Sequence, residues 1–484
     1  MLAAAIAGLG ATAPAEAGAV RNQPLVTAIT DAGYGNMDYQ VGYARTKAAG
    51  ATAIRFYEGW NLIAPGGSSK PPGFDASNPA DPAYNWTGLD AKVRNAVARG
   101  LEPIVSFARA PEWAQRLPPE DPRLNGNYAP DPAEFGAFAT AVATRYSGRF
   151  RGLPRVRYWQ VWNEPNLGWN LMPQYDTPWS RPVTASSRPV APYVYWPMVN
   201  AFTDAVRRVN RDNLVVAGAL APYARFGASD HGVAPLPFMR LMLCLTGRDR
   251  PQAGCNRRSA FDAWGHDPYT QGGPQRRPSV PGNVTLGNLR DMRRTLTAAS
   301  RAGRISSNGP VRFWIMEFGW NTRPPFARGV PTRLHARWVA EALYRMWLDG
   351  VTLATWFQLR DAPSYVSGLH YQAGLYTHCP RGPACDRPKL SLTAFRFPFV
   401  AFRSSSRATV WGRTPAGRRG TVTIQQRRGA GWVRLGRLRT NRHGIFGARL
   451  PRRGSGDLRA TLGRARSVPF SLTRPPDRTV IPGL

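Results

Sequence analysis

Lysine, histidine and acidic residues are scarce in this chain of 484 residues. Four of its 64 basic residues are lysines, its six histidines are scattered, and its 29 acidic residues leave a formal net charge of +35. The arginines run through the whole chain, as in proteins of GC-rich genomes, and no basic helix, zinc finger or aromatic–basic RNA motif accompanies them. The excess of arginine therefore predicts no nucleic-acid partner.

Cysteine is rare as well. The four cysteines form two close pairs, Cys244 with Cys255 and Cys379 with Cys385, in loop sequence rich in glycine, proline and arginine. Their spacing does not fit a zinc ribbon and the histidines offer no ligand set, so we expect no metal site and no cofactor. Two loop-closing disulfides, typical of an exported protein, are expected instead.

Long apolar runs are missing, so we expect no transmembrane segment. Residues 1–19 form a short apolar stretch, and Ala15-Glu16-Ala17 fits the A-x-A pattern before a signal-peptide cleavage site. The positively charged segment that opens such a leader is absent, so the leader is expected to begin before Met1. We expect a secreted protein; an unstructured alanine-rich terminus is the alternative.

Short apolar strands alternate with amphipathic helices over residues 22–397. Such alternation indicates βα units and a parallel sheet, and 43% hydrophobic residues suffice for a large core. The predicted strands lie at 25–30, 51–57, 101–107, 157–161, 214–218, 261–266, 311–316 and 353–358. Strong helical patterns cover 131–146, 194–209 and 331–349.

Two of these apolar strands are followed by a glutamate. In the first, Pro165 ends the hydrogen-bonded ladder and leaves Asn163 and Glu164 at the strand's C-terminal end. In the second, Glu317 comes directly after the apolar run. The alternative is a pair of strand-ending turns whose glutamates only face water. Because the C-terminal ends of parallel strands meet at one face, we favour a paired-carboxylate site, the minimum equipment for cleaving a glycosidic bond.

The segments 162–166 (Trp-Asn-Glu-Pro-Asn) and 314–319 (Trp-Ile-Met-Glu-Phe-Gly) resemble the two catalytic signatures of the TIM-barrel clan A of retaining glycoside hydrolases. The cellulase-like family 5 and the xylosidase-like family 39 are both similar, and the choice between them stays open. The resemblance implies a (β/α)8 TIM barrel over residues 22–397, with Glu164 as acid/base and Glu317 as nucleophile.

The same resemblance implies five substrate-binding positions: Arg55, Asn163, His266, Tyr269 and Trp356. Arg55 would lie beside the nucleophile and Asn163 would bind the sugar's 2-hydroxyl. Tyr269 would touch the nucleophile, and Trp356 would form a floor beneath the sugar. The clan reads His-x-Tyr or His-Pro-Tyr where this chain has His-Asp-Pro-Tyr, so the inserted Asp267 departs from the pattern.

Residues 398–484 differ from the preceding segment in composition and in hydrophobic pattern. From residue 401 onward 19 arginines face two aspartates, and glycine turns separate short alternating runs. Six strands are predicted, at 408–411, 421–425, 432–438, 444–450, 458–462 and 467–472. This segment resembles the small Ig-like β-sandwiches appended to many secreted bacterial enzymes. Its charge suggests contact with an anionic wall polymer.

The sequence thus predicts a secreted, monomeric retaining β-glycoside hydrolase that acts on a poly- or oligosaccharide by double displacement. The alternative is a non-catalytic carbohydrate- or wall-binding protein on a barrel scaffold. The sugar, the linkage and the choice between internal and terminal cleavage are left open.

Overall fold

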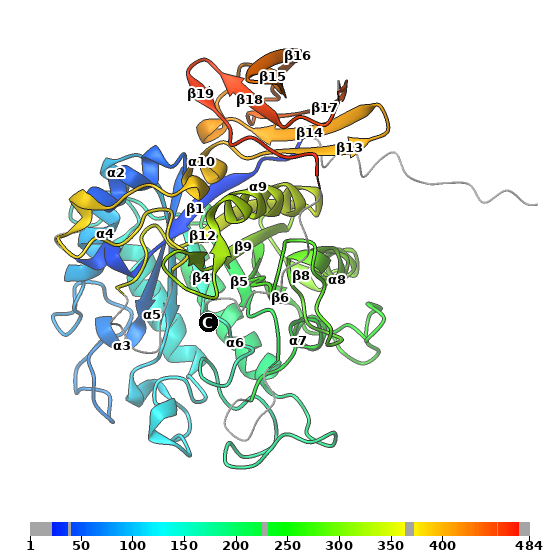
Figure 1. The fold of residues 1–484 in the computed structure, drawn as a ribbon. Coiled ribbons are helices and arrows are strands. Elements are labelled where there is room, and N and C mark those ends of the chain that lie inside the picture. Colours follow the sequence, from blue (N-terminus) through cyan, green and yellow to red (C-terminus); the bar gives the residue numbers. More distant parts are fainter. Residues whose placement is uncertain (1–21, 37–39, 225–230, 364–371, 453, 474–484) are drawn as a thin grey trace, which may run out of the picture.

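The computed structural model describes residues 22–36, 40–224, 231–363, 372–452 and 454–473. The predicted leader at 1–19 lies outside the described residues. Eight parallel strands close into a barrel in the order β1-β12-β9-β7-β5-β4-β3-β2, with helices around it (Figure 1). Antiparallel sheets follow at the C-terminal end. The predicted TIM barrel with an all-β appendage is therefore confirmed.

Every strand predicted for the barrel overlaps an observed one. The barrel strands are β1 Val26–Thr30, β2 Ala53–Gly59, β3 Glu102–Ala108, β4 Tyr158–Val161, β5 Leu214–Leu220, β7 Ala263–His266, β9 Arg312–Phe318 and β12 Val351–Phe357. The surrounding helices are α2 Gln40–Ala48, α3 Trp60–Ile63, α4 Thr87–Ala98, α5 Pro132–Arg145, α6 Ala191–Val209, α7 Pro235–Met242, α8 Leu289–Arg301, α9 Thr332–Leu348 and α10 Leu390–Arg396. Two short pairs lie outside the barrel, β6 Ser259–Ala260 with β8 Ile305–Ser306 and β10 Thr322–Arg323 with β11 Val330–Pro331.

Alternation along the strands separates the barrel interior from its outer face. Residues such as Ala53 on β2, Ala263 on β7 and Met316 on β9 form a buried cluster inside the barrel. Their strand neighbours, Ile54 and Trp264 among them, belong to the larger core beneath the helices. This two-residue period decides which side chains at the strand ends can reach the barrel mouth.

Helix α5 illustrates how local sequence fixes the outer layer. Asp131 accepts hydrogen bonds from the backbone N–H groups of residues 133 and 134, and Pro132 supplies a first helical residue that needs no N–H. The buried face of the helix carries Phe135 and Phe138, whose rings contact the fully buried Trp60. The same short segment, residues 131–138, therefore both starts helix α5 and packs it against the core.

The C-terminal unit consists of two antiparallel sheets in the orders β13-β14-β17 and β16-β15-β18-β19. Its strands are β13 Phe399–Ser404, β14 Arg407–Arg413, β15 Thr421–Arg428, β16 Gly431–Arg439, β17 Ile445–Pro451, β18 Leu458–Leu462 and β19 Ala465–Arg466. β13 was not among the predicted strands. The strand predicted at 467–472 is wrong, because only an isolated bridge between Leu458 and Phe470 forms there. Pro469, inside that stretch, has no N–H for a ladder.

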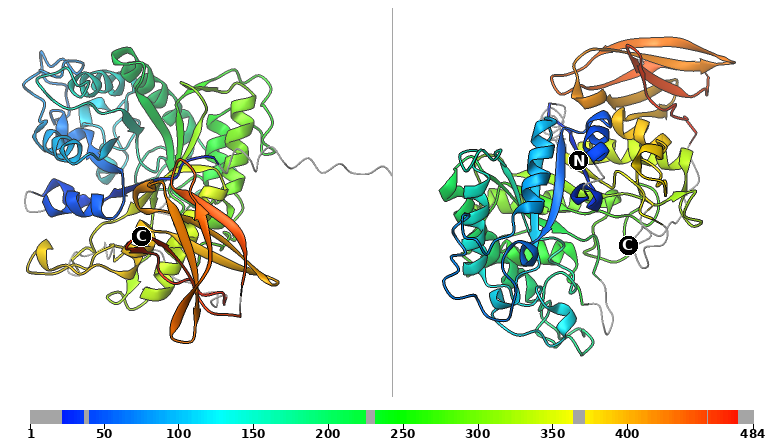
Figure 2. Two further views of the ribbon diagram at one scale, coloured as in Figure 1. Left: turned by 90° about the horizontal axis from the view of Figure 1, so that it is seen from above. Right: turned by 90° about the vertical axis from the view of Figure 1, so that its left-hand side faces the viewer.

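The C-terminal unit packs directly on helix α9, as Figures 1 and 2 show. Trp411 on β14 lies with its ring centroid 5.4 Å from that of Tyr344 and 5.6 Å from that of Trp347, both on α9. Arg337 on the same helix lies 3.9 Å over the ring of Phe470 and donates a hydrogen bond to the Ser471 carbonyl at 2.7 Å. The unit is therefore an integral layer on the barrel.

Trp411→Ala should consequently destabilise the whole chain. Trp411 is 4% exposed, and removing a buried tryptophan costs about 3–5 kcal/mol. Urea unfolding followed by tryptophan fluorescence and by circular dichroism would measure the loss. Trp432→Ala, on the outer face of the same unit where the ring lies under Arg459, should cost less than about 1 kcal/mol. Equal losses in the two variants would contradict the packing described here.

Both predicted disulfides are formed. Cys244–Cys255 and Cys379–Cys385 each join Cα atoms 5.7 Å apart. Each bridge closes a loop of the barrel domain, and within the described residues no cysteine is left free. Within the same ranges, none of the helices is both long and apolar enough to cross a membrane.

Candidate active site

Arg55 lies at the centre of a polar cluster at the C-terminal ends of the barrel strands. Its guanidinium is fully buried and donates to three acceptors: Gln160 Oε1 at 2.8 Å, Glu317 Oε1 at 2.6 Å and Asn163 Oδ1 at 2.6 Å. Arg55 shares the inward face of β2 with Ala53, and Gln160 lies on β4. One side chain thus connects the strands that carry the two candidate catalytic glutamates.

Glu317 reaches this cluster because β9 is irregular at its end. Phe313 and Ile315 belong to the outer core, so strict alternation would point Glu317 outward as well. The register between β9 and β12 shifts after Ile315, as at a β-bulge. A bulge re-aims the side chains that follow it, and here the Glu317 carboxylate meets Arg55. Its side chain remains 15% exposed.

Glu164 stands on a backbone turn after β4. Trp162 and Glu164 have φ values of 61° and 43°, in the left-handed region that non-glycine residues rarely adopt. The Glu164 N–H donates to the Ala219 carbonyl at 2.9 Å, and Asn166 holds the next loop by bonding the backbone of Ala221. This strained turn therefore presents a partly exposed carboxylate at the barrel mouth.

The two glutamates belong to one electrostatic site. Tyr269 donates a hydrogen bond to Glu317 Oε2 at 2.9 Å, and Asn170 donates to Glu164 Oε2 at 3.3 Å. Burial raises the pKa of Tyr269 well above its ordinary value, and the negative charges of Glu317 and Glu164 raise it further. Tyr269 therefore keeps its proton and acts as a donor. Five predicted site residues come together here: Arg55, Asn163, Glu164, Tyr269 and Glu317.

His266 and Trp356, the other two predicted site residues, lie outside the barrel mouth. His266 follows the outward alternation of β7, is fully buried, and its Nε2 lies 2.9 Å from the Val284 carbonyl. Burial lowers its pKa to about 4. Trp356 points outward from β12 against Phe318, with ring centroids 4.9 Å apart, and is fully buried. Both side chains are fully buried, so the structure does not bring them to the barrel mouth with the other five residues, and their predicted contact with the sugar has no support in it.

Strand alternation also identifies what the sequence analysis missed. Phe357, the neighbour of Trp356, is partly exposed and its ring lies 6.3 Å from that of Tyr269. Asp267, the neighbour of His266, shares the inward parity of Ala263 and is fully buried. In each strand, every second residue from an inward-facing apolar residue also faces inward. Applying this alternation to the strand ends would have selected both Phe357 and Asp267.

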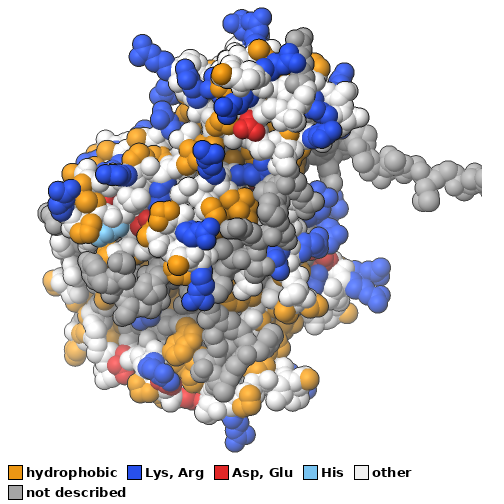
Figure 3. Space-filling model, viewed as in Figure 1, with side chains coloured by type: hydrophobic (Ala, Val, Ile, Leu, Met, Phe, Trp, Pro, Cys, Tyr) orange, Lys and Arg blue, Asp and Glu red, His pale blue; other side chains and the backbone are white. Residues whose placement is uncertain are grey.

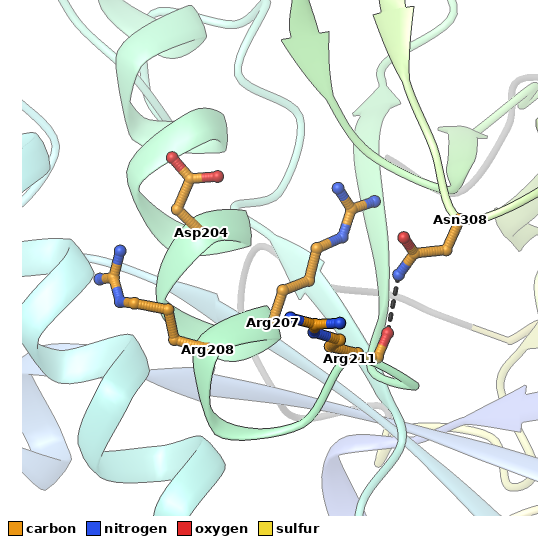
Figure 4. Close-up of a pocket in the computed structure, with 5 residues that line it drawn as sticks. All are labelled: Asp204, Arg207, Arg208, Arg211 and Asn308. Atoms are coloured by element: carbon orange, nitrogen blue, oxygen red, sulfur yellow. Dashed lines mark hydrogen bonds between the residues drawn. The ribbon is translucent and has the colours of Figure 1, made fainter.

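A separate hollow of about 550 Å³ lies elsewhere on the barrel (Figure 4). Its lining residues are Asp204, Arg207, Arg208, Arg211 and Asn308. They precede β5 and β9, so the hollow lies at the N-terminal ends of the strands, opposite the glutamates. Asn308 donates to the Arg211 carbonyl at 2.8 Å and Arg207 pairs with Asp262 at 2.9 Å, which are contacts that hold loops.

In the described part of the chain, no group of three or more His, Cys, Asp or Glu side chains is arranged so that it could bind a metal ion.

No model of a protein family and no curated protein matches this chain. Solved structures do match in fold. A family 39 glycoside hydrolase from the gut symbiont Bacteroides cellulosilyticus WH2 is 15% identical with a TM-score of 0.52, over 90% of this chain and 82% of that one. A glucosidase from Croceicoccus marinus is 13% identical with a TM-score of 0.50, over 90% of this chain and 97% of that one. At these identities, the chain shares the barrel fold of glycoside hydrolases.

Proposed function

We propose that the protein is a retaining β-glycoside hydrolase. The observation that carries the proposal is the pair of glutamates at the C-terminal barrel mouth, where Arg55 binds Glu317 and also Asn163, the residue before Glu164. Cleavage of a glycoside with retention needs two such carboxyl groups about 5–5.5 Å apart, one to protonate and one to attack. The fold shared with family 39 and glucosidase structures supports the same class of reaction.

The chemistry divides between the two carboxyl groups. Glu317, held by Arg55 and Tyr269, attacks the anomeric carbon while Glu164 gives its proton to the leaving oxygen. The glycosidic bond breaks, an alcohol departs, and a glycosyl ester with Glu317 remains. Glu164 then removes a proton from water, the water oxygen attacks the anomeric carbon, and Glu317 leaves as a carboxylate.

Hydrolysis of a panel of aryl β-glycosides tests this proposal directly. Proton NMR of the first-formed sugar should show the β-anomer, because two displacements restore the configuration. The α-anomer would indicate inversion. A protein that binds oligosaccharides yet hydrolyses none of the panel would favour the non-catalytic binding function.

The two disulfides also support the proposal that the protein is exported to an oxidising compartment.

We also propose that the outer face of the four-stranded sheet binds an anionic polysaccharide. Register places Arg437 beside Thr423, and Arg434 beside Gln425, on the face that lies away from the other sheet. Across that face Arg459 lies 4.0 Å over the ring of Trp432. Arginine guanidinium groups bind carboxylates, and an aromatic face suits the apolar side of a sugar. Figure 3 shows the basic side chains over this unit at the top of the view, with few acidic ones.

Neutralising three exposed arginines of β16 should weaken this binding. The variant Arg434→Gln/Arg437→Gln/Arg439→Gln should elute from immobilised polygalacturonate at lower salt than the wild type. Its matched control changes three exposed arginines of the other sheet, Arg403, Arg407 and Arg449, to glutamine. If both variants elute alike, net charge and not this face governs binding. Tighter binding of the wild type to duplex DNA than to the uronate polymer would overturn the choice of partner.

A further inference from the structure

A third carboxyl group, that of Asp267, is buried near the end of β9 and interacts electrostatically with both glutamates. The residue follows β7, its N–H donates to the Leu220 carbonyl at 2.9 Å, and its side chain is fully buried. Within the described residues, neither carboxyl oxygen accepts a hydrogen bond of regular geometry, and the nearby peptide N–H of Glu317 lowers the pKa of Asp267 less than burial raises it. An ionised carboxylate in such a position would be costly.

The groups that face Asp267 do not supply a free cation. Arg55 on β2 has committed its guanidinium to Gln160, Glu317 and Asn163. Tyr269, two residues along the chain, gives its hydroxyl proton to Glu317. The neighbouring His266 points away toward the Val284 carbonyl. The other ionisable neighbours are the carboxyl groups of Glu317 on β9 and Glu164 after β4.

We propose that Asp267 is uncharged in the folded protein and acts as a positioning residue beneath Glu317. Without a charge it adds no repulsion to the two carboxyl groups that perform the reaction. Because His266 on β7 pairs with Ile315 on β9, the O–H of Asp267 is a donor beside the strand end that carries Glu317. The inference deepens the proposed glycosidase function and rests on it for its consequences on turnover.

The electrostatics agree with this assignment. Burial raises the pKa of Asp267 well above the ordinary value of an aspartate, and the charges of Glu317 and Glu164 raise it further, against a lowering by Arg55. In the unfolded chain the group titrates near pH 3.9. Because the folded pKa is the higher one, the wild-type protein loses stability as pH rises from the unfolded value toward the folded value.

Asp262, at the opposite end of β7, provides a matched comparison. It is also fully buried, but it accepts hydrogen bonds from Arg207, from the Val215 N–H at 2.9 Å and from the Asn308 N–H at 2.7 Å. Asp262→Asn should lower the melting temperature at pH 7, since an amide cannot replace the carboxylate in these bonds. Asp267→Asn should do the opposite.

The experiment compares wild type, Asp267→Asn, Asp267→Leu and Asp262→Asn by melting temperature between pH 4 and pH 8. Asp267→Asn should match the wild type near pH 4 and exceed it increasingly as pH rises. A loss of stability in Asp267→Asn at pH 7 that disappears near pH 4 would overturn the uncharged state. This readout needs no substrate, so it decides the state of Asp267 even if no glycoside is cleaved.

Turnover separates positioning from simple packing. Both replacements are uncharged and branch at the same carbon atom as aspartate, but leucine is bulkier and only asparagine keeps a donor. Asp267→Asn should keep kcat within about threefold, whereas Asp267→Leu should lose about 10- to 100-fold in kcat with little change in KM. Equal kcat values in two stable variants would overturn the positioning role. A wild type inactive on every glycoside would refute the proposed function instead.

Discussion

Glu317→Ala abolishes turnover of an aryl β-glycoside, with an expected loss of about 10⁵-fold or more in kcat, because no nucleophile remains to form the glycosyl ester. Added azide should restore cleavage by entering from the vacated side. The product is then a glycosyl azide of inverted configuration, identified by NMR. Glu317 interacts with Arg55 and Tyr269 through its carboxylate alone, so the cavity left by alanine has room for a small anion.

Glu164→Ala is the matched control, because it removes the other carboxyl group from the same barrel mouth. A substrate with a good leaving group needs no proton, so the first step survives and the glycosyl ester accumulates for lack of a base. Azide needs no base and should release a product of retained configuration. Exchange of the two stereochemical outcomes would mean that the roles of Glu164 and Glu317 are reversed.

Arg55→Leu should have the second largest effect. The change leaves the Glu317 carboxylate without its cation and strips donors from Gln160 and Asn163. Removing one partner of a buried ion pair costs about 3–5 kcal/mol of stability. The loss of orientation and charge stabilisation in the site should lower kcat/KM by about 10²- to 10³-fold. Steady-state kinetics and urea unfolding on the same sample would measure both.

A second buried arginine separates these two effects. Arg145 on α5 pairs with Asp90 on α4 at 2.7 Å, away from the barrel mouth, and both side chains are 11% exposed. Arg145→Leu should therefore lose comparable stability while the folded fraction keeps its kcat. If Arg145→Leu lost activity as Arg55→Leu does, the kinetic effect of Arg55→Leu would be one of folding and not of the site.

Most strands and helices could be predicted from the sequence because the patterns that indicate them are local. An apolar run of β-branched and aromatic residues predicts a strand wherever it stands, and Asp131-Pro132 marks the start of α5. The C-terminal sheets were harder. Pro469 removes a donor from a stretch whose alternation otherwise fits a strand, and β13 follows α10 closely, after Phe397 and Pro398.

The sequence by itself determined the parallel barrel, the two disulfides and the two strands with a glutamate at or just after the C-terminal end. Only the tertiary structure decided which side chains meet. The bulge that turns Glu317 toward Arg55 depends on the register between β9 and β12, strands that helix α9 separates along the chain. Inward parity selects Asp267 and Phe357 over His266 and Trp356. A one-residue shift along a strand changes the face of every side chain, and register is fixed by packing across the whole barrel.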